Sequence, residues 1–161
     1  MMAITSIIEI VIFLPLIFTV PFPTTTLWFF IIATTFLHGC YRYSVVKSYQ
    51  HGDLSFVYPI ARGGSVLIIG LISIVILRAD INLTGIVGII LICLGLFMIS
   101  FFTTKKFNRS AFIIAITTAG LIATYTILDG IAVRRSENAF TFIYWMLLLN
   151  GIPMLIYAFF S

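Results

Sequence analysis

The sequence predicts an all-α integral membrane protein with about six transmembrane helices. Hydrophobic residues make up 61% of its 161 residues and charged residues only 9%. Soluble domains carry roughly 25% charged residues, so the composition indicates a membrane protein. Apolar runs long enough to span a bilayer, about 17–25 residues each, recur along the chain. They cover residues 4–22, 27–49, 56–77, 84–103, 111–132 and 142–160.

Short connections separate the six runs and predict antiparallel neighbours in one bundle. Backbone polar groups within lipid must pair inside their own segment, so each run is expected to be helical. The first run is expected to remain in the protein, because residues 1–8 lack the basic region of a cleaved signal peptide. In the fourth run, Gly85, Gly88 and Gly95 form a small-residue stripe that predicts close helix contact.

The connection at residues 50–55 holds the clearest helix stop and start signals. Gly52 can end one helix, and Asp53 or Ser55 can cap the next by accepting its free backbone N–H groups. Pro59 then falls in the first turns of that helix, where a proline is least unfavourable but still bends the axis. Together they predict a helix break with a proline shortly after it.

Two motifs resemble segments of a known family, and the aromatic pair Tyr144-Trp145 agrees with them. The motifs are Tyr49-x-x-Gly52-Asp53-Leu54-Ser55-x-Val57-Tyr58-Pro59-x-Ala61-Arg62-Gly63 and Thr118-Ala119-Gly120-Leu121-Ile122-Ala123-x-Tyr125-Thr126-x-x-Asp129-Gly130-x-Ala132-Val133-Arg134. The first is similar to the link between the third and fourth helices of EamA-type members of the drug/metabolite transporter superfamily. The second resembles the helix that opens their second half.

The resemblance implies part of a ten-helix bundle built from two five-helix halves of inverted topology. A six-residue echo around Pro15 and Pro153 aligns the chain with helices two to seven. Residues 1–103 would then be the remainder of the first half, 104–110 the connecting loop and 111–161 the start of the second half.

The implied function is movement of a small metabolite by alternating access, in a multi-pass protein of the bacterial inner membrane. The other half of the bundle would come from a second copy or from a partner that supplies the missing helices. A non-transporting membrane interaction subunit and an inactive transporter remnant are the alternatives.

One helix face in the second run carries His38, Tyr41 and Arg42, at spacings of three and four. These side chains either bond to neighbouring helices as structural glue or line a polar cavity that attracts a carboxylate-bearing substrate. In the third run, Arg62 either extends toward the head groups or faces the cavity. The neighbouring Tyr58 is a candidate for the same substrate site.

In the fifth run, Tyr125 and Asp129 share a face and end close to Arg134 and Arg135. Asp129 is either an interfacial salt-link residue or a site for a proton or substrate, with Tyr125 as its hydrogen-bond partner. Trp145 is either an interfacial anchor or a further substrate contact.

The sequence does not predict an enzyme, a metal site or a cofactor. His51, the only histidine besides His38, falls in a connection, and no acidic cluster accompanies either. The net charge of +4 is assigned to loops beside anionic lipid head groups rather than to nucleic acid. Basic residues of the connections divide four against three between the two sides, so the charge pattern leaves the topology open.

Overall fold

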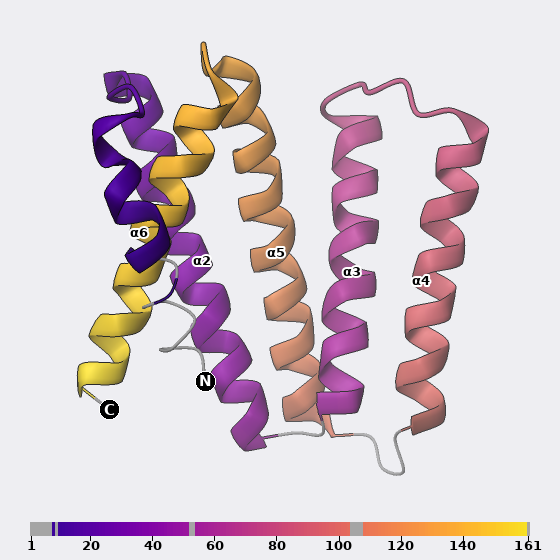
Figure 1. Ribbon diagram of the computed structural model, residues 1–161. Coiled ribbons are helices and arrows are strands. Elements are labelled where there is room, and N and C mark those ends of the chain that lie inside the picture. Colours follow the sequence, from indigo (N-terminus) through magenta and orange to yellow (C-terminus); the bar gives the residue numbers. More distant parts are fainter. Residues whose placement is uncertain (1–7, 9, 52–53, 104–107, 161) are drawn as a thin grey trace. The chain divides into compact units, whose positions relative to one another are not determined.

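Figure 1 shows the computed structural model of the chain, which describes residues 8, 10–51, 54–103 and 108–160. Helix accounts for 87% of the structure, and no strand occurs within these ranges. The predicted all-α class is therefore confirmed. The elements are η1 (Leu14–Phe18), α2 (Thr25–His51), α3 (Leu54–Val75), α4 (Leu83–Thr103), α5 (Arg109–Arg135) and α6 (Ala139–Phe160).

Three helices among the described residues are long and apolar enough to cross a membrane. These spans are Phe56–Val75, Leu83–Phe102 and Arg109–Arg135. They support a membrane protein, whereas the number six stays a prediction. The described apolar part of α6, Ala139–Ile152, is shorter than a span. α2 is long, but polar side chains interrupt its apolar sequence at several positions.

The first predicted run differs from the structure, because the described part of residues 4–22 does not continue as an α-helix to its end. Residues 10–13 are α-helical, Leu14–Phe18 forms the tighter 3₁₀ helix η1, and no helix covers residues 19–24. Prolines at positions 15, 21 and 23 explain the change, since each lacks the N–H that an α-helix interior requires.

Side-chain caps start the later helices. Asn82 Oδ1 accepts from the Gly85 nitrogen at 2.8 Å, and Asn108 Oδ1 accepts from the Ser110 nitrogen at 2.9 Å. Each cap supplies an acceptor to an N–H group that has none inside its own helix. Of the two caps expected before α3, Ser55 is instead the second residue of that helix, and Asp53 lies outside the described residues.

The other residues of the predicted helix break fall in two places. Gly52 and Asp53 lie outside the described residues, between the end of α2 at His51 and the start of α3 at Leu54. Pro59 is buried inside α3, one and a half turns from its start. The predicted helix break is therefore present between His51 and Leu54, and Pro59 follows it within α3.

The chain forms two compact units. The first unit is Met1–Tyr43 with Ile127–Ser161, and the second is Ser44–Thr126. Helices α2 and α5 each contribute residues to both units. The predicted division into family-like halves at 104–110 is a different kind of boundary and stays a prediction.

The core of the first unit is aromatic and is held by side-chain hydrogen bonds. Phe30 and Ile31 of α2 pack with Phe142, Tyr144 and Trp145 of α6. The Tyr144 hydroxyl donates to the Phe13 carbonyl at 2.9 Å, and the Trp145 indole N–H donates to the Pro21 carbonyl at 3.1 Å. These bonds attach the segment around η1 to α6.

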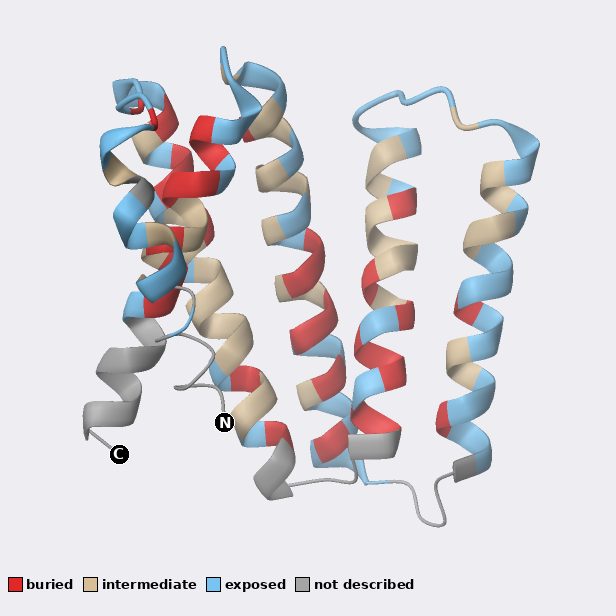
Figure 2. Ribbon diagram, viewed as in Figure 1, coloured by how far each residue is buried: buried red, intermediate tan, exposed pale blue. Residues whose placement is uncertain are grey.

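The core of the second unit is built largely from small residues. Ala111 and Ala115 of α5 pack with Phe56 and Ile60 of α3, and the buried residues of α3 gather in its first half (Figure 2). In α3, a Cβ built on Gly64 would lie 3.1 Å from the Cβ of Ala119. A close approach at this glycine therefore brings α3 and α5 together.

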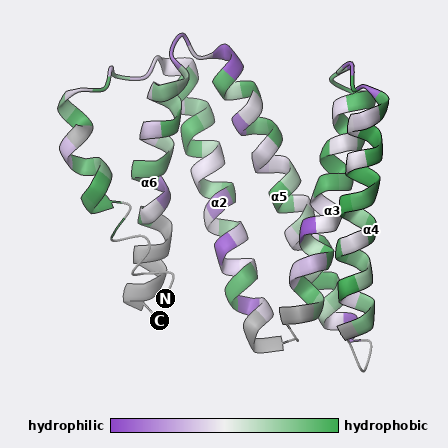
Figure 3. Ribbon diagram, turned by 45° about the vertical axis from the view of Figure 1, so that its right-hand side comes forward, coloured by the Kyte–Doolittle hydropathy of each residue, from purple (hydrophilic) through white to green (hydrophobic). Residues whose placement is uncertain are grey.

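Helix α4 packs on α3 through one narrow face. The Ser100 hydroxyl donates to the Phe56 carbonyl at 3.0 Å, and a Cβ built on Gly63 would lie 3.4 Å from Leu96 Cβ. Only 11% of the apolar span of α4 is buried, although the helix is apolar along almost its whole length (Figure 3). Such a surface suits a lipid environment.

The glycine stripe predicted on α4 does not make the expected contacts. Cβ atoms built on Gly88 and Gly95 would meet nothing within 4 Å. The nearest neighbour of a Cβ on Gly85 is Ile81, in the connection before the same helix. Among the described glycines, those of α3 make the close approaches, because their face is turned toward the neighbouring helices.

Candidate functional site

An ionisable pair lies in the first unit between α2 and α5. His38 Nε2 and Asp129 Oδ2 are 3.3 Å apart, although the two residues are 91 positions apart in the chain. Their side chains are only 16% and 22% exposed. The sequence singled out both residues, and the structure brings them together.

The second oxygen of the Asp129 carboxylate has no protein partner. Its Oδ1 atom is buried and accepts no hydrogen bond within the described part of the chain. A buried polar atom of this kind is uncommon and needs an explanation such as a water, an ion or a ligand. Asp129 therefore offers an acceptor to a proton or to an N–H or O–H group of a bound molecule.

Polar side chains continue along one face of α2 on both sides of His38. Thr35, His38 and Arg42 follow at steps of three and four, so they share a face over about 10 Å of helix. All three are half-buried. Thr35 Oγ1 is a second buried oxygen without a partner among the described residues.

A third such oxygen belongs to Asn150 on α6, whose side chain is 5% exposed. Helices α2 and α6 begin beside one cavity, capped by Thr24 and Asn138. Thr35 and Asn150 follow these caps by 11 and 12 residues. At 1.5 Å per residue, both lie roughly 17 Å from that end of the unit.

Sequence reasoning missed Thr35 and Asn150. For Thr35 a signal existed, since it precedes His38 by three residues on the same helix face. Asn150 offered only its polarity within an apolar run.

Three of the predicted candidates belong to the second unit. Arg62 is exposed, and its guanidinium carbon lies 5.6 Å from the centroid of the Tyr58 ring, as in a cation–π contact. Tyr58 is 50% exposed and Tyr125 is half-buried. Arg62 is therefore exposed within its unit, and its two expected roles, extension toward the head groups or a place at a cavity, both stay predictions.

The remaining candidates lie in the first unit. Tyr41 is half-buried on α2, one residue before Arg42. Trp145 is 5% exposed and packs with Phe22 and Trp28 at centroid distances of 5.1 and 5.4 Å. Since its indole N–H already donates to a backbone carbonyl, Trp145 acts in the core and leaves no polar atom for a substrate.

The second unit has a polar link of its own. Ser44 Oγ and Thr118 Oγ1 are 2.7 Å apart, and Thr118 Oγ1 also donates to the Ile114 carbonyl at 2.7 Å. Ser44 is therefore the donor in the bond to Thr118. Both hydroxyls are satisfied, so this link ties α2 to α5 and leaves no open group.

No family model, curated protein or solved structure matches this chain. Within the described ranges, no group of three or more His, Cys, Asp or Glu side chains is placed to hold a metal ion. The chemistry of the first unit is thus that of a hydrogen-bonding site with one carboxylate, one imidazole and unpartnered oxygens.

Proposed function

We propose that the chain is an EamA-like drug/metabolite transporter that moves a small polar or amphipathic metabolite by alternating access. The pair His38–Asp129, with Arg42 on the same helix face as His38, lines the substrate path. The carrying observation is the buried Asp129 Oδ1 atom without a protein partner. The motif resemblance and the three apolar spans support the same proposal.

The position of the pair supports a functional role. Asp129 lies six residues, about 9 Å, inside the end of the span Arg109–Arg135. An ionised side chain is unfavourable by about 2.5–3.5 kcal/mol at the centre of a span and by less toward its ends, and charged residues within spans usually mark substrate or proton paths. A purely structural link between α2 and α5 would need neither charge, because the Ser44–Thr118 bond makes one without any.

Helix α2 has the composition of a path-lining helix. Its polar residues Thr35, His38 and Arg42 share one face, whereas Phe29, Ile32 and Phe36 are 61–70% exposed. A helix with an apolar surface and one polar stripe meets lipid on one side and a polar cavity on the other. The opposite wall would come from a second copy of the chain or from a partner half, in the bacterial inner membrane.

Reconstitution into liposomes tests the proposal. Vesicles containing the purified chain are loaded with a defined mixture of amino acids, nucleosides and sugars, and efflux is followed by mass spectrometry. We expect efflux of at least one compound above empty vesicles, and loss of that efflux in Asp129→Asn. Asp80→Asn is the matched control, because Asp80 is an exposed carboxylate in the α3–α4 connection.

Two results would contradict transport by this site. One is efflux no faster than that from empty vesicles for every compound. The other is efflux that Asp129→Asn leaves unchanged. Absence of efflux together with purification of a stoichiometric membrane partner would favour the alternative, a non-transporting interaction subunit.

A further inference from the structure

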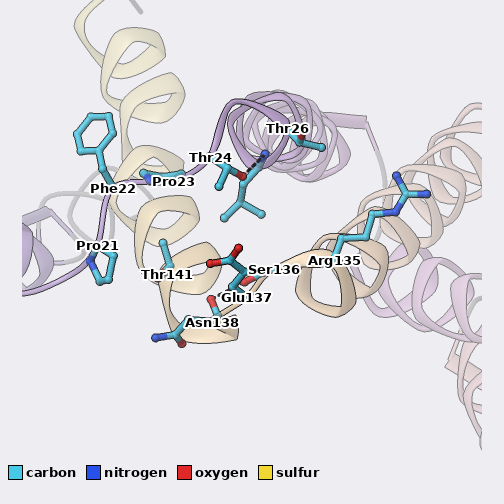
Figure 4. Close-up of a pocket in the computed structure, with 11 residues that line it drawn as sticks. Pro21, Phe22, Pro23, Thr24, Thr26, Arg135, Ser136, Glu137, Asn138 and Thr141 are labelled. Atoms are coloured by element: carbon cyan, nitrogen blue, oxygen red, sulfur yellow. Dashed lines mark hydrogen bonds between the residues drawn. The ribbon is translucent and has the colours of Figure 1, made fainter.

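A cavity lies at one end of the first unit, where the chain enters α2 and passes from α5 to α6 (Figure 4). Its volume is about 530 Å³, within the roughly 300–1,000 Å³ typical of small-molecule sites. The candidate transport residues His38 and Asp129 are not part of its lining. The cavity is therefore a separate feature of the unit.

Two long helices begin at this cavity. Thr24 caps α2, with its Oγ1 3.4 Å from the Leu27 nitrogen, and Asn138 caps α6, with its Oδ1 2.9 Å from the Phe140 nitrogen. The Trp28 and Thr141 N–H groups donate to the carbonyls of the cap residues Thr24 and Asn138, each at 3.0 Å. The N–H groups that precede them in each first turn have no acceptor inside their own helix. Both helix starts also carry the positive end of a helix dipole. This end of the cavity therefore favours an anionic group such as a phosphate.

Thr141 gives a second and independent indication of a ligand. It is 5% exposed and lines the cavity, and its hydroxyl has no hydrogen-bond partner among the described residues. Figure 4 shows Thr141 projecting from α6 into the space between Pro21 and Glu137. Because this hydroxyl has no partner in the described part of the protein and borders the cavity, it is available as a donor to a molecule bound there.

Glu137 favours a cationic group in the cavity, in contrast to the helix starts, which favour an anionic one. Its side chain is exposed and lines the same cavity, with the carboxylate directed toward the start of α2 (Figure 4). Arg135 lines the cavity as well, and its guanidinium carbon lies 5.8 Å from the centroid of the Phe30 ring. Glu137 disfavours an anion on its own side of the cavity, while Arg135 and the helix starts disfavour a cation alone. A ligand with both charges satisfies both.

The surroundings of the cavity select a lipid over a free solute. The span Arg109–Arg135 ends at a lining residue, so the cavity lies at the end of a membrane-spanning segment. Phe22 also lines it, and its ring centroid lies 5.7 Å from that of the half-buried Trp28. Tryptophans concentrate at head-group level. Phe22 is 74% exposed, which leaves an apolar surface for an acyl chain beside the polar cavity.

We propose that this cavity binds the head group of a zwitterionic phospholipid with a primary amine, of the phosphoethanolamine type. The phosphate lies at the starts of α2 and α6 and accepts a hydrogen bond from the Thr141 hydroxyl. The ammonium group donates to the Glu137 carboxylate. This binding does not depend on the proposed transport activity and can be tested without it.

Native mass spectrometry of the detergent-purified chain tests the assignment. The chain is incubated with equimolar phosphatidylethanolamine, phosphatidylcholine and phosphatidylglycerol of identical acyl chains, and the retained lipid is identified. We expect several-fold preferential retention of phosphatidylethanolamine. Glu137→Gln should remove the preference over phosphatidylglycerol, whereas Thr141→Val should lower retention of all three lipids.

Matched controls keep the result interpretable. Asp80→Asn removes an exposed carboxylate that does not line the cavity. Thr124→Val removes an exposed hydroxyl that donates to the Gly120 carbonyl of its own helix. Neither control should change lipid retention. The assignment is overturned if the wild type retains the three lipids equally, retains none, or prefers phosphatidylglycerol. Persistence of the preference in Glu137→Gln would overturn it as well.

Discussion

The two units of this chain differ in the residues that form their cores and in the polar groups that they bury. The first unit has an aromatic core, buried hydrogen bonds from Tyr144 and Trp145, and an ionisable pair beside unpartnered oxygens. The second unit has an alanine-rich core and close glycine contacts, and its helix α4 exposes most of its apolar surface. The proposed function assigns the transport chemistry to the first unit on the basis of this contrast, and a scaffolding role to the second.

The largest expected effect concerns the aromatic core. Trp145→Ala should destabilise the protein by about 3–5 kcal/mol, the usual loss for a buried large aromatic side chain. Phe102→Ala is the control, because Phe102 on α4 is 83% exposed. It should change stability by less than about 0.5 kcal/mol. Thermal unfolding in detergent, followed by circular dichroism, measures both. Equal effects would remove the distinction between the two units.

The next effect concerns the glycines of the second unit. Gly64→Ala should destabilise the protein by about 1–3 kcal/mol, because the new methyl group would lie 3.1 Å from Ala119 Cβ. Gly88→Ala should be neutral or stabilising by about 0.4–1 kcal/mol, since a Cβ at this position would have no neighbour within 4 Å. The same unfolding assay compares them. A larger loss in Gly88→Ala would mean that α4, not α3, makes the close helix contact.

A smaller effect is expected for the ionisable pair. A double-mutant cycle of His38→Gln and Asp129→Asn should give a coupling free energy of about 1.5–3 kcal/mol, as for a hydrogen bond to a charged group. The two side chains are 3.3 Å apart and mostly buried. Coupling below about 0.3 kcal/mol would show that the residues do not interact in the folded protein.

The smallest effect concerns the end of α3. Arg78 has a φ of 48°, in the left-handed region that a residue with a Cβ adopts only at a cost. Arg78→Gly should therefore stabilise the protein by up to about 1 kcal/mol. Ala79→Gly, at the neighbouring position, should give no gain. A loss of stability in Arg78→Gly would show that the arginine side chain matters more than the backbone strain.

The sequence was sufficient for the class of the protein, because apolar run length and helix stop signals are local properties. The break after His51 and the helices α3, α4 and α5 follow from them. The 3₁₀ segment at Leu14–Phe18 was not predicted. A proline such as Pro15 within an apolar run is equally compatible with a kink in a continuous α-helix.

Contacts between distant segments were harder to predict. The partner of Asp129 depends on how α2 and α5 are rotated about their axes, and run length and hydropathy contain no information on rotation. The same limit explains the glycines, where Gly64 rather than Gly88 faces another helix. It also explains Trp145, which resembles an interfacial anchor in the sequence but is buried in the core.

The central claim is that the chemistry belongs to the first unit, and efflux from reconstituted vesicles tests it most directly. Asp129→Asn and Arg62→Ala are compared under identical conditions, one variant for each unit. Loss of a hydrogen bond to a charged group, about 1.5–3 kcal/mol, predicts that Asp129→Asn slows efflux by roughly 10- to 150-fold. Arg62→Ala, at an exposed site stacked on Tyr58, should slow it by less than about twofold. The opposite ranking of the two variants would contradict the claim.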